Sequence, residues 1–430
     1  MAVDRGANPL AAQRHIPPST NIVKEGACES AIYGDKQVMM YTNLWYAAES
    51  SGKVGEQPVR VRMLGRDFVL FRDEAGAVAC LSDVCPHRGS SLSRGKCQGD
   101  GTISCPFHGW RFDRSGSCKK IPSQQNPDED IPTGAKVDAY PVEEKYGLIW
   151  VFLGDNIENA LPIIDIPEID SDEWRHAHYS DIWHANQHWS KMTDLDHVHL
   201  PVVHGIDFGG DNPFRPPDHK VEILENGFRT EIRGHTPPSA RSFKEYKGPR
   251  SSAVSKLAFY MPGFILRGQV AFAGEQAGMM NMFYEITTPI DEQQTKMFYI
   301  FFRNFFMEPE HDEMHVQRNL KNIFQDKANA ESIMPKRAPD LDDWPLVKVD
   351  REDRLISAYW KILRNLRNDG CQIDRVKLDA LDSNGDYRVI PSPARKQDPD
   401  GWVFDTVPMV SADEARESEK DLESVQLGAA

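Results

Sequence analysis

Two short loops, each with one cysteine and one histidine, restrict the fold of this chain more than any other feature. Residues 85–89 read Cys-Pro-His-Arg-Gly and residues 105–110 read Cys-Pro-Phe-His-Gly-Trp. Each loop offers one thiolate and one imidazole, so the two loops together form a four-ligand metal set. A glycine follows each pair, at Gly89 and Gly109, where a backbone without a Cβ can fold closely around an inorganic group. The fold must therefore bring two separate turns together.

The mixed composition of the loops separates two kinds of metal site. Structural zinc sites commonly pair C-x-x-C with H-x₃₋₅-H, so that cysteines and histidines occupy separate halves. In a Rieske cluster, two histidines replace two cysteines on one of two irons. One cysteine and one histidine in each half favours the iron–sulfur cluster, and structural zinc is the alternative.

The loops and the strands around them resemble the Rieske domain of aromatic-ring-hydroxylating oxygenases and their demethylase relatives. The resemblance implies a [2Fe-2S] cluster in which Cys85 and Cys105 bind one iron, while His87 and His108 bind the other. The other cysteines have no partner at ligand spacing and are interpreted as unpaired thiols: Cys28, Cys80, Cys97, Cys118 and Cys371. Scattered thiols in an odd number do not resemble a disulfide framework, which favours a cytoplasmic protein.

A second motif with metal-binding residues lies further along the chain, at residues 196–204, which read Asp-His-Val-His-Leu-Pro-Val-Val-His. His199 and His204 match the D-x-x-H-x₄-H element of the same family. On a straight α-helix, residues five apart point about 140° away from each other. We therefore expect the helix to break between them, at Pro201. The pairs His184/His188 and His311/His315 have zinc-like i,i+4 spacing, but we interpret them as solvated or hydrogen-bonded histidines.

Two histidines need a carboxylate to complete a facial triad that leaves positions open for oxygen and substrate. In the family, this third ligand lies on a late helix, and the resemblance implies Asp353. Four nearby carboxylates are alternatives if the helix is offset: Asp342, Asp343, Asp350 and Glu352.

Asp196 lies one helical turn before His199. The resemblance implies that Asp196 joins a Rieske histidine of a neighbouring subunit to the iron histidine of its own subunit, along a path His108, Asp196, His199. Relatives often carry Asn, Asp or Glu four or five residues before this aspartate. This chain has Met192 and Lys191 there instead, with Asp194 nearer, so the resemblance does not carry over the hydrogen bonds behind the ligands, although it still implies the ligands themselves.

The hydrophobic patterns predict an α+β protein with two folded parts. An N-terminal all-β Rieske [2Fe-2S] domain is followed by a helix-grip-like domain, whose antiparallel sheet and helices hold the mononuclear iron. We expect an N-terminal extension at 1–40, the Rieske domain at 41–156, the catalytic domain at 157–410 and a charged tail at 411–430. Expected strands include 221–224, 258–261, 280–287 and 296–305, and expected helices include 309–329 and 350–368.

These features predict a terminal oxygenase that hydroxylates or oxidatively demethylates an aromatic or other apolar ring. A cis-dihydroxylating dioxygenase and a Rieske electron carrier without oxygenase activity are the alternatives. No nucleotide-binding glycine motif is present, so electrons must come from a separate NAD(P)H-dependent reductase, directly or through a ferredoxin. Resemblance to the alpha-only subgroup implies a homotrimer or a multiple of one. The net charge of −15 argues against nucleic-acid binding, and no apolar run is long enough to span a membrane. Five apolar side chains are candidates for the substrate pocket: Met261, Phe264, Leu266, Phe283 and Phe301.

Overall fold

The computed structural model describes residues 39–124, 131–205, 208, 212, 214–235, 252–272, 277–339 and 353–416. Residues 1–38 of the expected N-terminal extension and 417–430 of the expected charged tail lie outside these residues, as do Cys28 and the alternative ligands Asp342, Asp343, Asp350 and Glu352. Within the described ranges, no helix is both long and apolar enough to cross a membrane.

The N-terminal part is all-β, as predicted. A three-stranded sheet in the order β1-β11-β10 is formed by β1 (Leu44–Ser50), β10 (Val142–Lys145) and β11 (Leu148–Leu153). A four-stranded sheet in the order β2-β3-β4-β9 is formed by β2 (Val59–Met63), β3 (Arg66–Arg72), β4 (Val78–Ser82) and β9 (Ala139–Tyr140). The predicted hairpin turn is confirmed between β3 and β4, where Gly76 has a φ of 80°, a value that glycine adopts without steric cost.

One of the two cysteine- and histidine-containing loops lies within a small four-stranded sheet in the order β5-β6-β7-β8, and the other leads into it from β4. Its strands are β5 (Lys96–Cys97), β6 (Ile103–Ser104), β7 (Arg111–Phe112) and β8 (Cys118–Lys120). The loop at 105–110 joins β6 to β7, and the loop at 85–89 follows β4 closely. A hairpin between β6 and β7 and a connection between two sheets thus present the metal-binding residues.

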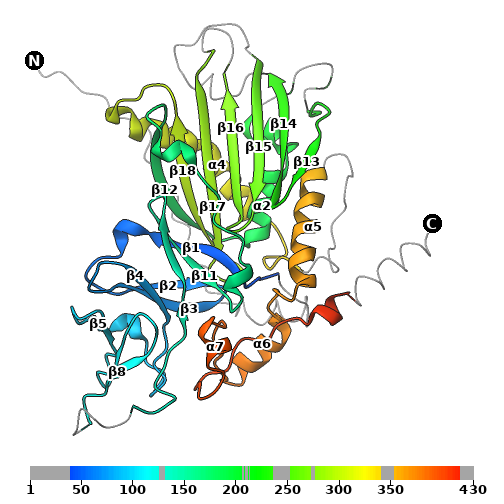
Figure 1. The fold of residues 1–430 in the computed structure, drawn as a ribbon. Helices are drawn as coiled ribbons and strands as arrows, with labels where there is room; N and C mark the ends of the chain where they lie inside the picture. The colour runs from blue at the N-terminus through cyan, green and yellow to red at the C-terminus, as the bar shows by residue number, and fades with distance from the viewer. Residues whose placement is uncertain are drawn as a thin grey trace, which may run out of the picture. The chain divides into compact units, whose positions relative to one another are not determined.

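The C-terminal part is built on a seven-stranded antiparallel sheet in the order β12-β18-β17-β16-β15-β14-β13 (Figure 1). Its strands are β12 (Arg175–Trp183), β13 (Val221–Leu224), β14 (Gly227–His235), β15 (Ser252–Tyr260), β16 (Ile265–Ala271), β17 (Met280–Pro289) and β18 (Thr295–Arg303). The four expected strands correspond to β13, β15, β17 and β18.

Strand β18 shows why the sequence of a strand in this sheet can be almost continuously apolar. Phe298, Ile300 and Phe302 pack on one side against β1 and β11. Tyr299 and Phe301 alternate with them and pack on the other side against α4. Because side chains alternate along a strand, burial of both faces requires apolar residues at successive positions.

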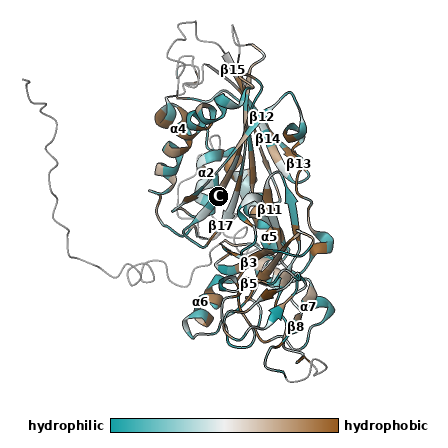
Figure 2. Cartoon of the chain, turned by 90° about the vertical axis from the view of Figure 1, so that its left-hand side faces the viewer, coloured by the Kyte–Doolittle hydropathy of each residue, from teal (hydrophilic) through white to brown (hydrophobic). Residues whose placement is uncertain are grey.

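Three helices border the sheet: α2 (Gln187–Leu195), α4 (Asp312–Ala330) and α5 (Arg354–Asn368). Helix α4 contacts β12 and α2, whereas α5 contacts β13 and β14. Figure 2 shows hydrophilic and hydrophobic residues on α4, as expected for a helix with one face on the sheet. Two short helices follow α5, at α6 (Arg375–Ser383) and α7 (Ala394–Gln397).

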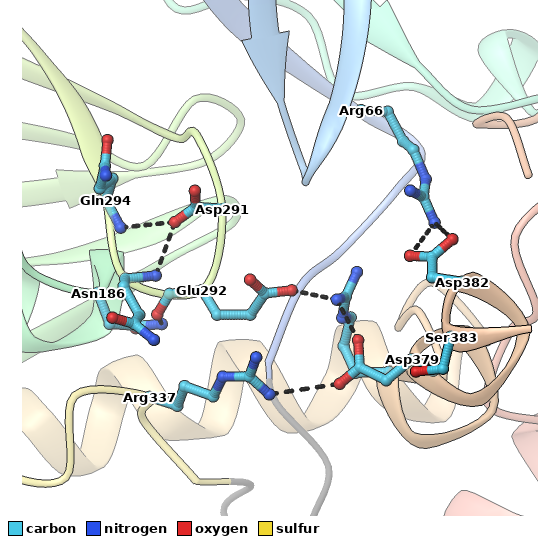
Figure 3. Close-up of polar contacts among 11 residues, drawn as sticks. Arg66, Asn186, Asp291, Glu292, Gln294, Arg337, Asp379, Asp382 and Ser383 are labelled. Atoms are coloured by element: carbon cyan, nitrogen blue, oxygen red, sulfur yellow. Dashed lines mark hydrogen bonds and ion pairs between the residues drawn. The ribbon is translucent and has the colours of Figure 1, made fainter. Parts of the chain in front are cut away.

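A polar network joins the β2–β3 hairpin to the beginning of α2 (Figure 3). Arg66 donates two hydrogen bonds of 2.9 Å to Asp382 on α6. Arg375, also on α6, pairs with Glu292 in the β17–β18 turn. The Glu292 carbonyl in turn accepts a 2.8 Å hydrogen bond from Asn186, which caps α2. The cluster-bearing part and the helix that leads to His199 are therefore linked through charged side chains.

The segment after α6 packs back on the N-terminal part. The Tyr140 hydroxyl donates a 2.7 Å hydrogen bond to the Ile390 carbonyl. Buried Asp138 accepts hydrogen bonds from Ser392 and Arg395 at 2.6 and 2.7 Å. The expected domain limits, including the one at residue 156, stay predictions.

Candidate metal centres

The two cysteine- and histidine-containing loops form matching turns. The Gly89 amide donates to the Cys85 carbonyl at 2.8 Å, and the Gly109 amide donates to the Cys105 carbonyl at 3.0 Å. Both glycines have positive φ values, 67° and 72°. Residues with a Cβ adopt this backbone region only with strain, so each glycine is needed for the turn that positions its ligands.

The ligand side chains of the two turns come together in two pairs. The rings of His87 and His108 have centroids 4.4 Å apart, and His87 stacks on Trp110 at 4.6 Å. The thiols of Cys85 and Cys105 are in hydrogen-bonding contact; this contact, together with burial, raises the pKa of Cys85. The same contact, with the amides of Phe107 and His108, lowers the pKa of Cys105 to about 5. The pair thus favours one thiolate even without metal.

These residues fit a two-iron cluster better than one tetrahedral ion. A tetrahedral zinc ion with bonds of about 2.0–2.3 Å would bring all four ligand atoms within roughly 4 Å of each other. Among the described residues, no three of these four side chains have ligand atoms that all lie within 4.8 Å of one another. In addition, the Nδ1 atom of His87 is buried without a hydrogen-bond partner, as expected of an atom directed at a metal.

A second set of ligand atoms does converge on one point. His199 Nε2 and His204 Nε2 lie 3.3 Å apart, and Asp326 Oδ1 lies 3.5 Å from the first and 3.0 Å from the second. Ligands at right angles on a metal, with bonds of about 2.1 Å, are separated by about 3.0 Å. Asp326 Oδ1 is also buried without a hydrogen bond. The triangle therefore fits the two-histidine, one-carboxylate face of a mononuclear iron site.

The expected helix break between the two histidines is wrong in its position. Helix α2 ends at Leu195, and Asp196 has an extended backbone, so the break precedes His199. Leu200–His204 (η5) then forms a π-helical turn with Pro201 at its start, closed by a hydrogen bond from the Gly205 amide to the Leu200 carbonyl. An i→i+5 turn places residues five apart on the same side. Proline is tolerated in a first turn because its missing N–H has no intrahelical partner there.

The third member of the triangle is Asp326 on α4 and not the expected Asp353, which stands at the start of α5 and is outside the group. Asp326 comes three residues after Ile323 and four before Ala330, both of which pack toward the sheet. A carboxylate beside the apolar face of a helix is costly to bury without a partner. An acidic residue beside the apolar positions was therefore already visible in the sequence of the expected helix at 309–329.

Neighbouring side chains orient the two imidazoles differently. His204 Nδ1 donates to Gln325 Oε1 at 2.9 Å, which leaves Nε2 as the metal-facing lone pair. Burial lowers the pKa of His204, but Asp326 and Gln325 outweigh it and raise the pKa overall. Asp196 Oδ2 lies 3.9 Å from His199 Nδ1, beyond hydrogen-bond range. Asp196 therefore stands next to His199, and its Oδ1 accepts from the Val198 amide.

The histidines of the pairs His184/His188 and His311/His315 were interpreted as solvated or hydrogen-bonded, and this is confirmed for the two buried ones. His188 Nε2 donates to the Met39 carbonyl and its Nδ1 accepts from the Tyr359 hydroxyl, at 3.0 and 2.6 Å. His315 Nε2 lies 2.7 Å from Asn281 Oδ1. His184 is exposed and His311 is half-buried.

The apolar pocket candidates divide between two places. Met261, Phe264 and Leu266 belong to the large core that also contains α5. Phe301 packs with α4, and Phe283 contacts both clusters. Leu266 is paired with Glu285, which is paired with Tyr299, so Leu266 shares a face of the sheet with Phe283 and Phe301.

Comparison with known proteins assigns both parts of the chain. A Rieske [2Fe-2S] domain matches residues 44–141, and a vanillate O-demethylase oxygenase C-terminal domain matches residues 187–369. The chain is 29% identical over 281 residues to 4beta-methylsterol monooxygenase of Methylococcus capsulatus, which covers 62% of this chain and 69% of the relative. It is 27% identical over 318 residues to methylxanthine N1-demethylase NdmA of Pseudomonas putida, which covers 72% of this chain and 83% of the relative.

Solved structures agree on the fold. The crystal structure of dicamba monooxygenase bound to 3,6-dichlorosalicylic acid has a TM-score of 0.65, with 22% identity, and covers 80% of this chain and 99% of that one. The two matched domains and the fold agree. The chain therefore belongs to the Rieske non-haem iron oxygenases, as a catalytic (alpha) subunit that carries a [2Fe-2S] cluster and a mononuclear iron and uses O₂ as oxidant.

Proposed function

We propose that this chain hydroxylates, or oxidatively demethylates, an aromatic or other apolar ring with electrons from a separate reductase. The observation that carries the proposal is the triangle of His199, His204 and Asp326 ligand atoms, with edges of 3.0 to 3.5 Å. A Rieske electron carrier needs no such second site. Three protein ligands on one face leave the remaining positions for oxygen and substrate.

The proposed cluster ligands are Cys85 and Cys105 on one iron and His87 and His108 on the other. The proposed mononuclear ligands are His199, His204 and Asp326, with Asp326 in place of Asp353. When bound, the mononuclear iron supplies the open positions at which O₂ is reduced beside the substrate. The protein holds the ligands in place: Gln325 fixes the orientation of His204, and the π turn keeps both imidazoles on one side.

A homotrimer, or a multiple of one, is proposed from the exposed side chains at the two sites. Phe107, in the cluster loop, is 63% exposed and lies against exposed His108. Val202, between the iron histidines, is 73% exposed, and Phe324, near Asp326, is 46% exposed. Exposed apolar side chains at both sites favour contact between subunits. Asp196, whose side chain is 36% exposed next to His199, is proposed to receive the neighbouring subunit's His108 there.

Single oxygen insertion is favoured over cis-dihydroxylation because the two relatives named above are a monooxygenase and a demethylase. Those names support a ring substrate, from a methylated heterocycle to a sterol. The electron donor is proposed to be an NAD(P)H-dependent reductase, directly or through a ferredoxin. A cytoplasmic location is proposed because all cysteines in the described ranges are free thiols.

Oxygen uptake with a generic reductase, against methylated heterocycles, aromatic acids and polycyclic compounds, tests this function. His199→Ala and His204→Ala should each abolish product formation while the visible spectrum of the cluster stays unchanged. Cys105→Ser should remove that spectrum. Release of formaldehyde, a hydroxylated ring or a cis-diol identifies the reaction. If both histidine variants pass electrons and form product as the wild type does, the proposed function is wrong.

A further inference from the structure

Basic side chains gather around the cluster loops of an otherwise acidic chain. Residues 84–124, which carry both loops, contain seven lysines and arginines and two aspartates, a net charge of +5. The whole chain has a net charge of −15, so the rest of it is strongly acidic. Four of the seven basic side chains are exposed and have no carboxylate of the described residues within 4.0 Å: Arg88, Arg94, Lys96 and Lys120.

The small sheet places three basic side chains in one row. Lys96 on β5 pairs with Ser104 on β6, and Ser104 pairs with Arg111 on β7. Arg111 pairs in turn with Lys120 on β8. Directly paired residues of an antiparallel sheet point to the same face. The neighbouring row points the other way, into the apolar core: Cys97, Ile103, Phe112 and Cys118. The first four residues, here called the cationic row, therefore lie on the outer face of the sheet.

The polar contacts of the cationic row leave most of its positive charge uncompensated. Gln98 Nε2 donates a 2.8 Å hydrogen bond to Ser104 Oγ, which lies 3.2 Å from the Lys96 carbonyl. Neither contact involves an acidic group. Of the three basic side chains, only Arg111 has a carboxylate within 4.0 Å in the described ranges. That carboxylate belongs to Asp100, 3.0 Å away and 52% exposed, and exposed ion pairs of this kind are weak.

The cationic row lies directly beside residues of the cluster loop. Ser104 precedes Cys105 in the sequence, and Arg111 follows Trp110. The half-buried Trp110 ring is nearly parallel to the ring of His87, with the centroids 4.6 Å apart and an interplanar angle of 4°. A protein bound on the row is therefore next to one cluster cysteine and next to a tryptophan that is stacked on a cluster histidine.

We propose that the cationic row is the docking surface of the electron donor, and that this donor is a redox protein with an acidic surface. The inference rests on the proposed function, which requires a separate donor. The rest of the chain repels an acidic protein and the row attracts it, so charge guides the donor to the cluster. Complexes between redox proteins are transient and have small interfaces. Each encounter transfers one electron from the reduced donor to the cluster, with no bond formed or broken.

A second copy of this chain is the alternative occupant of the row. Exposed apolar side chains, such as Phe107 at 63%, mark the part of the loop that is proposed above to contact another subunit. Lysines are depleted in the centres of protein interfaces, because burial of an unpaired ammonium group is costly. Lys96 and Lys120 therefore favour a transient encounter, in which both ammonium groups keep part of their water.

Anaerobic stopped-flow mixing of the full-length protein with reduced flavodoxin, a small acidic flavoprotein, tests the proposal before any turnover. The second-order rate constant for electron transfer to the cluster should fall as salt is added, because salt screens the attraction. The triple variant Lys96→Gln/Arg111→Gln/Lys120→Gln should lower this rate constant by about tenfold or more at low salt. A wild-type rate constant that does not depend on salt, or a triple variant within about twofold of the wild type, would overturn the proposal.

Three controls separate docking from other effects of the substitutions. The variant Lys96→Arg/Arg111→Lys/Lys120→Arg keeps the charges and should keep the rate constant. Reduced methyl viologen, a small cation that needs no docking surface, should reduce the triple variant at least as fast as the wild type. If the triple variant fails to assemble its cluster, Lys96→Gln/Lys120→Gln leaves the Arg111 pair intact and should lower the flavodoxin rate constant in the same direction.

A charge-matched variant separates the row from the total charge of the protein. Lys53→Gln/Lys145→Gln/Lys256→Gln removes three exposed lysines that lie outside the small sheet. This variant should stay within about twofold of the wild type. A loss as large as that of the triple variant in the row would mean that total charge alone decides, and would contradict the proposal.

Subunit number and turnover distinguish the remaining outcomes. Light scattering should give the same number of subunits for the wild type and for the triple variant in the row. A lower number in the variant would assign the row to a second copy of this chain and overturn the donor proposal. A wild type that accepts electrons from flavodoxin with the expected salt dependence, but forms no product, would overturn the proposed function and leave the docking surface standing.

Discussion

The two metal centres of this chain are built in opposite ways. The cluster loops carry their ligands on two tight turns, each closed by a glycine with positive φ. The proposed ligands of the mononuclear site come from the region after α2, from a π turn and from α4, a helix more than a hundred residues later. The first centre depends on local backbone geometry, and the second depends on how α4 packs against the sheet. Local changes should therefore damage the first centre, and changes in packing or burial should damage the second.

The largest effect on product formation is expected when the Asp326 carboxylate on α4 is removed. Asp326→Ala should reduce product formation by more than about 100-fold, because loss of a ligand exceeds the 10- to 100-fold effect typical of a residue behind a ligand. The cluster spectrum should stay unchanged. Asp353→Ala, at the start of α5, is the matched control and should retain turnover. The reverse result would restore Asp353 as the ligand.

Low pH should destabilise the part of the protein around α2, which contains the buried His188, more than the cluster loops. Burial, partly opposed by the Met39 carbonyl, lowers the pKa of His188 to about 4. The unfolded chain takes up this proton near the ordinary pKa of about 6.5, so stability should be lost as the pH falls from 6.5 to 4. The shift corresponds to roughly 3 kcal/mol. Denaturant unfolding of the wild type and His188→Gln over this range checks it, and the variant should be less sensitive to pH. Equal sensitivity would contradict a buried neutral His188.

The two loop glycines should differ in their tolerance of a side chain. Both have positive φ, which costs a residue with a Cβ roughly 1–2 kcal/mol. A Cβ at Gly109 would also lie 3.1 Å from Pro122 Cγ, whereas nothing lies within 4 Å of one at Gly89. Gly109→Ala should therefore lower cluster content more than Gly89→Ala, as measured by acid-labile sulfide per chain. Equal losses would mean that the backbone strain alone decides.

The smallest effect concerns the residue behind His204. Gln325→Ala removes the acceptor of the His204 Nδ1 proton and should weaken mononuclear iron binding by about tenfold. Gln317→Ala, on the same helix, removes only an exposed hydrogen bond to Glu313 and should leave iron affinity unchanged. Iron titration of the chelated protein measures both. Similar affinities for the two variants would show that Gln325 does not orient the imidazole.

The same contrast explains what could be predicted from the sequence. The cluster loops, the β3–β4 turn and the strands β17 and β18 were predictable because their signals are local: ligand spacing, glycines and runs of apolar residues. The strands β12, β14 and β16 were not predicted. Asp326, which we propose in place of Asp353, was not predicted because its nearness to His199 and His204 depends on which face of α4 packs next to η5. The sequence near Asp353 offered a competing pattern. The position of the helix break was wrong because a π turn, and not the proline, brings His199 and His204 together.

Iron and acid-labile sulfide content of Asp326→Ala, measured beside Asp353→Ala and the wild type, tests the central claim most directly. We expect Asp326→Ala to keep the iron and sulfide of the [2Fe-2S] cluster and to lose the additional mononuclear iron, while Asp353→Ala keeps both. If Asp326→Ala retains the full wild-type iron content, the triangle of His199, His204 and Asp326 is not the mononuclear iron site.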